Sequence, residues 1–361
     1  MAPVSASAAA LGSPKAVSYA RALSLLSTVA IWYGAAAAAA VFTKLAVRGA
    51  TSHGIAAGVA IVATVCAANM SALAACACVV LVLRGRSFSQ LLGAVIAASA
   101  PQLVLAHAVG NGAATAATVY ADASVVQAIK ATEPAFAVFV GHDSAEMTPR
   151  KLVGLLLVIV AGLTCGSLQL GDALWTRAGA LGISLASVSN LAFALRNVSA
   201  KAAMQHNSRA AGTKQGVIMD GVSGLCASSV VAAVGFSVVA GICVLLRPVE
   251  SIHALMRPGV LSATLLSSVG FAGYQLASTF VLERVSPVTH ALVNVGKRVF
   301  IVTATAIAMG TRLSPAAAVA LAVLVAGLAL HNDGIVRAIS TVASRLMERT
   351  GTEKTRFNKE V

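Results

Sequence analysis

Long apolar runs recur along nearly the whole chain, and they limit the folds that it can adopt. A bilayer core about 30 Å thick is crossed by a helix of roughly 20 apolar residues. Of the 361 residues, 58% are hydrophobic and 11% are charged, which is atypical of a soluble domain. The alternation typical of a membrane barrel is not seen. We therefore predict an all-α membrane protein with ten transmembrane helices, near residues 22–44, 55–83, 89–110, 113–141, 152–169, 178–200, 216–246, 259–282, 286–309 and 314–331.

Polar residues gather at the two ends of the chain. Residues 1–21 form a polar segment that is compatible with a short transit peptide and with a disordered cytosolic end. Residues 332–361 form a basic tail that resembles an amphipathic surface segment. The membrane domain between them covers 22–331, with halves at about 22–169 and 178–331. Lysine and arginine are in excess in the loops on the side that both ends share, which predicts termini on the cytosol-like side.

Four basic residues fall inside predicted helices: Lys130, Arg196, Lys297 and Arg298. A charged Lys or Arg at mid-bilayer costs about 2.5–3.5 kcal/mol on insertion scales, so it needs a wet cavity or a partner. Glu133, three residues beyond Lys130, is a candidate partner. The membrane segments hold too few other carboxylates to neutralise the set. This excess favours an anionic substrate over purely structural pairing or snorkelling.

The types of donor indicate which anion is bound. Arginine grips pairs of carboxylate or phosphate oxygens and lysine adds a mobile point charge, a combination that suits phosphate. No Walker-type loop is present in the sequence, so nothing indicates transport driven by ATP. The six cysteines fall in predicted helices and are interpreted as packing residues, and we expect no metal and no cofactor. The net charge of +14 is explained by membrane orientation, without nucleic acid.

Two stretches of the chain parallel each other. Lys130 aligns with Lys297 and Pro149 aligns with Pro315, at nearly constant separation. Two halves of five helices each have opposite orientations, and inverted repeats place a substrate site at the midplane between them. The pattern favours a carrier over a channel or a membrane enzyme. Pro134 is expected to kink the fourth helix.

Three motifs carry a resemblance to a known family. They are "AIKATEPAFAVFVG", "SNLAFALRNVSAKAAM" and "ERVSPVTHALVNVGKRVFIV". In this order and in these helices they resemble the motifs of the plastid phosphate translocators, which belong to the drug/metabolite transporter superfamily. The resemblance runs from about Trp32 to Leu330. It implies ten helices in two inverted halves, a plastid inner envelope location, and exchange of inorganic phosphate for a phosphorylated C3, C5 or C6 metabolite.

The resemblance also assigns roles to residues. The family's phosphate clamp falls on Lys130, Lys297 and Arg298, with Tyr274 as a hydroxyl donor, while Arg196 matches the arginine that holds the rest of the substrate. An empty pocket with unpaired cations is expected to resist closure, which would make the carrier an obligate exchanger.

Two positions depart from the family pattern. Asn111 stands where many members have histidine, and Ala114 stands where they have a hydroxyl residue, so the resemblance implies phosphate but not a triose. His107, one helical turn away, could replace the missing imidazole or be a packed core residue. Weaker candidates on the helix of the Lys-Arg pair are Thr289, His290 and Asn294.

Other functions stay open at the level of sequence. A nucleotide-sugar transporter of the same fold, in the Golgi or endoplasmic reticulum membrane, would also use buried cations. A paralogue that keeps the clamp but has altered specificity is a second alternative. A membrane enzyme acting on phosphorylated lipid would need an acid/base pair or a metal cluster, and the sequence predicts neither.

Overall fold

The computed structural model describes residues 14–48, 50–85, 101–141, 148–170, 176–210, 221–284, 287–310 and 314–331. Every regular element in these ranges is a helix, which confirms the predicted all-α architecture. The elements are α2 (Pro14–Val47), the 3-10 helix η2 (Ala50–His53), α3 (Ile55–Leu83), α5 (Pro101–Tyr120), α6 (Ala123–Lys130), α7 (Glu133–Gly141), α8 (Pro149–Leu170), α9 (Arg177–Ala210), α10 (Gly221–Leu246), α11 (Pro248–Leu255), α12 (Val260–Arg284), α13 (Pro287–Met309) and α14 (Pro315–His331).

The predicted boundary between the third and fourth helices is wrong. α5 runs unbroken to Tyr120, and residues 89–100 of the predicted third helix lie outside the described residues. Gly110 and Gly112 do not end the helix. A Cβ at Gly110 would lie 3.2 Å from the ring of Phe193, and one at Gly112 would lie 3.1 Å from the ring of Phe236. These glycines therefore let α9 and α10 pack closely against α5.

Other ends differ from prediction by a few turns. α2 begins at Pro14 rather than near residue 22, and α9 continues to Ala210 beyond the predicted end at 200. α11 is an additional short helix in a predicted loop, with a proline in its first turn where a missing N–H is tolerated. Residues 1–13 and the predicted tail at 332–361 lie outside the described residues.

The fourth predicted helix is broken inside the bundle. α6 ends at Lys130 and α7 begins at Glu133, with Pro134 in the first turn of α7. Proline has no N–H, so the normal helical hydrogen-bond ladder cannot continue through this position. The amide of Thr132 turns back to the carbonyl of Ile129 at 3.1 Å, which closes the end of α6. The expected kink is thus a break that separates two short helices.

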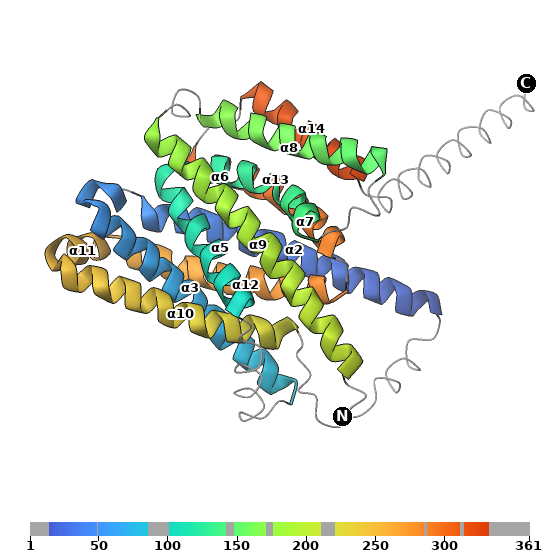
Figure 1. Ribbon diagram of the computed structural model, residues 1–361, viewed down its shortest axis with the longest axis horizontal. Coiled ribbons are helices and arrows are strands. Elements are labelled where there is room, and N and C mark those ends of the chain that lie inside the picture. Colours follow the sequence, from blue (N-terminus) through green and yellow to red (C-terminus); the bar gives the residue numbers. More distant parts are fainter. Residues whose placement is uncertain are drawn as a thin grey trace, which may run out of the picture.

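The helices pack in antiparallel and crossed pairs (Figure 1). α2 packs along α12, α3 along α10, α5 along α9, and α8 along α14, while α13 contacts α2, α6 and α7. The α8 and α14 pair lies at one edge of the bundle and the α3 and α10 pair at the opposite edge (Figure 1). Glycines permit the closest contacts: a Cβ at Gly270 would lie 2.9 Å from the carbonyl oxygen of Ala35.

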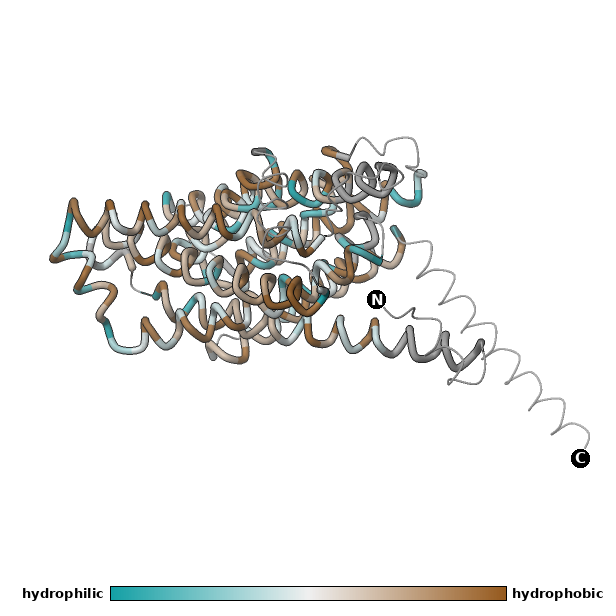
Figure 2. Tube along the Cα trace, turned by 90° about the horizontal axis from the view of Figure 1, so that it is seen from below, coloured by the Kyte–Doolittle hydropathy of each residue, from teal (hydrophilic) through white to brown (hydrophobic). Residues whose placement is uncertain are grey.

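Apolar residues dominate the helices along most of their length (Figure 2). Seven of the described helical segments are long and apolar enough to cross a membrane: Ser24–Val47, Ile55–Leu83, Ala123–Val140, Pro149–Leu168, Arg177–Ala200, Gly221–Leu246 and Val260–Arg284. α14 is apolar but shorter, and α5 and α13 are outside the set. The buried face of α5 carries His107 and Asn111, and that of α13 carries Lys297 and Arg298. These buried polar residues make α5 and α13 less apolar.

Candidate substrate-binding cavity

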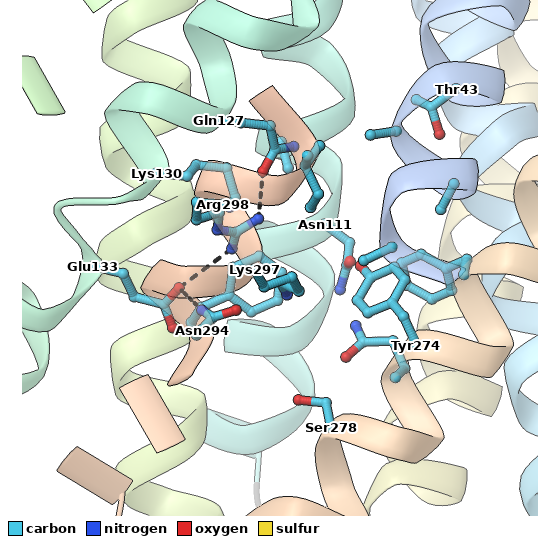
Figure 3. Close-up of a pocket in the computed structure, with 18 of the residues that line it drawn as sticks. Thr43, Asn111, Gln127, Lys130, Glu133, Tyr274, Ser278, Asn294, Lys297 and Arg298 are labelled. Carbon is cyan, nitrogen blue, oxygen red and sulfur yellow. Dashed lines mark hydrogen bonds and ion pairs between the residues drawn. The ribbon is translucent and has the colours of Figure 1, made fainter. Parts of the chain in front are cut away.

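A polar cavity lies inside the bundle and collects the buried basic residues. α6, α7 and α13 supply Gln127, Lys130, Glu133, Lys297 and Arg298 on one side, and α2 and α12 face them across the cavity with Thr43, Tyr274 and Ser278 (Figure 3). Arg196 of α9 also lines the cavity. The structure thus brings together all five of the main candidate residues, although they come from four separate helices.

The charge in this cavity is unbalanced. The exposed fraction is 3% for Lys130, 4% for Lys297 and 8% for Arg298, and Arg196 is partly buried. Glu133, also 3% exposed, is the one acidic side chain among the described residues that line the cavity. Four basic groups therefore face one carboxylate in an environment where an unpaired charge is costly.

Arg298 holds the one ion pair found among the described lining residues. Its Nη2 lies 3.4 Å from Oε2 of Glu133, and its Nη1 donates to Oε1 of Gln127 at 2.5 Å (Figure 3). The i, i+3 spacing made Glu133 a candidate partner for Lys130, but the two side chains do not pair, because the break between α6 and α7 takes them off the shared face of a continuous helix. Glu133 reaches across to α13 instead.

Lys130 is held by uncharged groups. Its Nζ donates to the hydroxyl of Ser189 at 2.5 Å, and that hydroxyl donates to the carbonyl of Gly110 at 2.7 Å. The amine also lies 4.4 Å from the centre of the Phe193 ring. These contacts position the amine without neutralising it. Lys130 is the last residue of α6, where a positive charge also interacts favourably with the helix dipole.

Lys297 has the fewest polar contacts of the four. Its Nζ lies 4.9 Å from the Trp32 ring centre and 5.1 Å from that of Tyr274. Within the described part of the chain, no hydrogen-bond acceptor contacts this amine. Two cation–π contacts replace only part of the lost hydration. The amine is therefore available to an anion that enters the cavity.

Arg196 is surrounded by neutral acceptors. Its Nη2 donates to Oδ1 of Asn197 at 2.9 Å, and its Nη1 lies 3.2 Å from Nδ1 of His107 and 3.4 Å from Oε1 of Gln275. Its guanidinium carbon lies 5.0 Å from the Phe193 ring centre. His107 is fully buried and is not a lining residue, and its imidazole contacts the cavity through Arg196.

The weaker candidates occupy different environments. Asn111 lines the cavity and donates to the carbonyl of His107 at 2.8 Å, and Ala114 lines it without a polar group. His290 stacks on Trp32, with ring centres 5.0 Å apart, and its Nε2 lies 2.8 Å from the hydroxyl of Ser278. Asn294 donates to Oε2 of Glu133 at 2.6 Å. The side chain of Thr289 lies outside the described residues.

Sequence reasoning missed the uncharged partners of the basic groups. They are Gln127, Ser189, Phe193, Asn197 and Gln275. Ser189, Phe193 and Arg196 are spaced at i, i+4 and i+7, so they share one face of α9, and this pattern was the available signal. Within the described residues, no group of three or more His, Cys, Asp or Glu side chains could hold a metal ion.

Ion pairs lie at both ends of the bundle, away from the cavity. Where α2 ends, Nζ of Lys44 donates to the carbonyls of Thr118 and Ala121, each at 2.9 Å, and lies 3.6 Å from Asp122. Where α3 and α12 end, Nη2 of Arg84 lies 3.7 Å from Oε2 of Glu283. These contacts connect the ends of helices that line or flank the cavity.

Comparisons with known proteins place the chain among transporters. A sequence model of the Triose-phosphate Transporter family matches residues 23–332. The phosphoenolpyruvate/phosphate translocator 1, chloroplastic, of Oryza sativa subsp. japonica is 28% identical over 248 residues, covering 67% of this chain and 57% of that protein.

Two further relatives differ in the substrate that they are named for. The triose phosphate/phosphate translocator, chloroplastic, of Spinacia oleracea is 27% identical over 263 residues, covering 69% of this chain and 58% of that protein. The glucose-6-phosphate/phosphate translocator 2, chloroplastic, of Arabidopsis thaliana is 27% identical over 233 residues, covering 64% of this chain and 57% of that protein. The matched region spans somewhat more than half the length of these curated relatives.

Proposed function

The chain belongs to the Triose-phosphate Transporter family, and from that premise we propose that it exchanges inorganic phosphate for a phosphorylated C3, C5 or C6 metabolite across an organelle membrane. The observation that carries this proposal is the cavity in which three buried basic side chains and the partly buried Arg196 face one carboxylate. A phosphate group supplies the negative charge that the chain itself lacks there. The proposed activity is transport, without chemical change of the substrate.

Lys130, Lys297 and Arg298 form the proposed phosphate clamp. Lys297 contributes an amine whose contacts are aromatic rings, and Lys130 contributes an amine that its hydrogen bond to Ser189 positions. Arg298 contributes a planar guanidinium that can bind two oxygens at once. Arg196 and Tyr274 are proposed to contact the remainder of the substrate, since both line the same cavity. His290, Asn294 and Asn111 then act by positioning these groups rather than by carrying charge.

Ten membrane spans in two inverted halves are part of the proposal. The spans would be α2, α3, α5, α6 with α7, and α8, followed by α9, α10, α12, α13 and α14. The packing supports this order. Replacing each helix by its counterpart five spans away converts the α2–α12 pair into the α5–α9 pair, and it leaves the α3–α10 and α8–α14 pairs unchanged. A broken helix at the centre of such a repeat is the usual place for a substrate site.

Obligate exchange follows from the unbalanced charge. Closing both ends of an empty cavity would seal unpaired cations in a medium of low dielectric, whereas a bound phosphate neutralises them and permits the rearrangement. The named substrates of the relatives are phosphoenolpyruvate, triose phosphate and glucose 6-phosphate. We place this chain in a plastid-type membrane by analogy with those relatives, and both termini on the cytosol-like side.

Uptake of labelled phosphate into proteoliposomes tests the proposal. Vesicles containing the purified protein are preloaded with phosphate or with buffer alone, and the wild type is compared with Lys297→Gln. We expect uptake only into phosphate-loaded vesicles, and its loss in the variant. Phosphorylated C3, C5 and C6 metabolites are then tested as internal counter-substrates. Wild-type protein that shows no uptake under either loading, but exchanges a nucleotide sugar, would disprove the proposal.

A further inference from the structure

Glu133 lies at the centre of the polar network in the cavity. Its Oε1 accepts a hydrogen bond from Nδ2 of Asn197 at 3.3 Å. Its Oε2 accepts a hydrogen bond from Nδ2 of Asn294 at 2.6 Å and lies 3.4 Å from Nη2 of Arg298. Glu133 thereby connects the start of α7 to α9 and α13. Its position at the first turn of α7 also suits a carboxylate, because the helix dipole is positive there.

The carboxylate belongs to one half of the chain only. In the alignment that pairs Lys130 with Lys297, the position of Glu133 corresponds to Phe300, which is 47% exposed. The second half therefore places a half-exposed aromatic ring where the first half places a buried acid. The acid of the first half contacts the guanidinium of Arg298, which belongs to the second half.

Phosphate and Glu133 need the same donors. In Arg298, Nη2 contacts the carboxylate of Glu133 and Nη1 donates to Gln127. These two terminal nitrogens are also the ones that bind two oxygens of an oxyanion. A phosphate placed on Arg298 would bring two negative groups together, and like charges at close range repel. Glu133 can release Arg298 without becoming an orphan, because Asn197 and Asn294 still donate to it.

We propose that Glu133 is a resident counter-ion, which occupies Arg298 in the empty carrier and competes with the incoming phosphate for it. This inference rests on the proposed function, since it requires a phosphate group in the cavity. The carboxylate lowers the charge imbalance of the empty state and weakens the hold on phosphate. It therefore favours release of the substrate and makes the binding affinity a compromise between capture and turnover.

Glu133→Gln removes the charge and keeps the shape of the side chain. Within the described part of the chain Oδ1 of Asn294 has no hydrogen-bond partner, so the Asn294 amide can turn to accept a bond from the new glutamine. We expect phosphate to bind about tenfold more tightly, about 1.4 kcal/mol, because no carboxylate then competes for Arg298 or repels the phosphate. In exchange assays both KM and Vmax should fall, because tight binding slows release.

Gln127→Glu is the matched opposite change. Gln127 lies on the other arm of the Arg298 guanidinium, so this variant adds a second carboxylate to the group that Glu133 already contacts. We expect phosphate to bind about tenfold more weakly. A purely structural role of Glu133 would make both variants less stable without shifting the affinities in opposite directions.

Calorimetric titration of the detergent-purified, full-length proteins with inorganic phosphate measures both effects, and thermal unfolding verifies that each variant is folded. Tighter binding in Glu133→Gln with weaker binding in Gln127→Glu supports the inference. Folded variants with unchanged affinities, or a Glu133→Gln protein that binds more weakly while wild type binds phosphate, would overturn it and leave the proposed function standing. Wild-type protein that binds no phosphate would overturn both.

Discussion

The Lys297 amine provides a test that separates stability from function. Lys297 lies near the middle of α13 and is 4% exposed. Its Nζ lies 4.9 Å from the centre of the Trp32 ring and 5.1 Å from that of the Tyr274 ring. A cation at mid-bilayer costs about 2.5–3.5 kcal/mol, and cation–π contacts offset about 0.5–2 kcal/mol of that cost. Lys297→Met keeps the length of the side chain and removes the charge. We therefore expect the phosphate-free protein to become more stable by about 1 kcal/mol.

The same variant should lose phosphate affinity. A hydrogen bond to a charged group contributes about 1.5–3 kcal/mol, so the dissociation constant for phosphate should rise at least about tenfold. Thermal unfolding in detergent, with and without phosphate, measures both effects in one experiment. Lys130→Met is the control: it also loses the bond to Ser189, so its gain in stability should be smaller. A Lys297→Met protein that unfolds at a lower temperature than wild type without phosphate would refute the reasoning.

Three further predictions follow from the contacts around the cavity. Gly270→Ala should destabilise the α2–α12 contact by about 1–3 kcal/mol through overpacking, whereas Gly235→Ala, where a Cβ meets nothing within 4 Å, should not; thermal unfolding compares them. Lys44→Gln should lower the melting temperature, because the end of α5 loses its bonds, but phosphate affinity in calorimetry should stay within about twofold, since the residue does not line the cavity. The sulfurs of Cys78 and Cys226 lie 3.4 Å apart, so mild oxidation should join α3 to α10, and mass spectrometry after alkylation detects the loss of two free thiols.

Hydropathy predicted the helices well because a membrane span needs a long apolar run whatever it packs against. The local errors have structural causes. The predicted boundary between residues 110 and 113 is absent, because Gly110 and Gly112 accommodate the rings of Phe193 and Phe236 inside a continuous α5. The short amphipathic α11 could not be found by a search for spans, since it is only eight residues long.

The charged part of the cavity was predictable because buried basic residues are rare and costly. Their partners were not, since Arg298 meets Gln127 and Glu133 across two helices, and the sequence contains no local signal for that contact. The spacing of Lys130 and Glu133 allowed a local pair as one alternative, but the break at residues 131–132 separates them. Which residues are buried can be predicted from one sequence here, whereas which of them meet depends on how the helices pack.

The most direct test of the proposed phosphate clamp is a crystal structure of the protein with inorganic phosphate. We expect a phosphate ion in the cavity, with its oxygens within hydrogen-bond distance of Nζ of Lys130, Nζ of Lys297 and the guanidinium of Arg298, and with Glu133 moved away from Arg298. A cavity that stays without phosphate at saturating concentration, or a phosphate bound elsewhere in the bundle, would contradict the central claim that these side chains form the phosphate clamp.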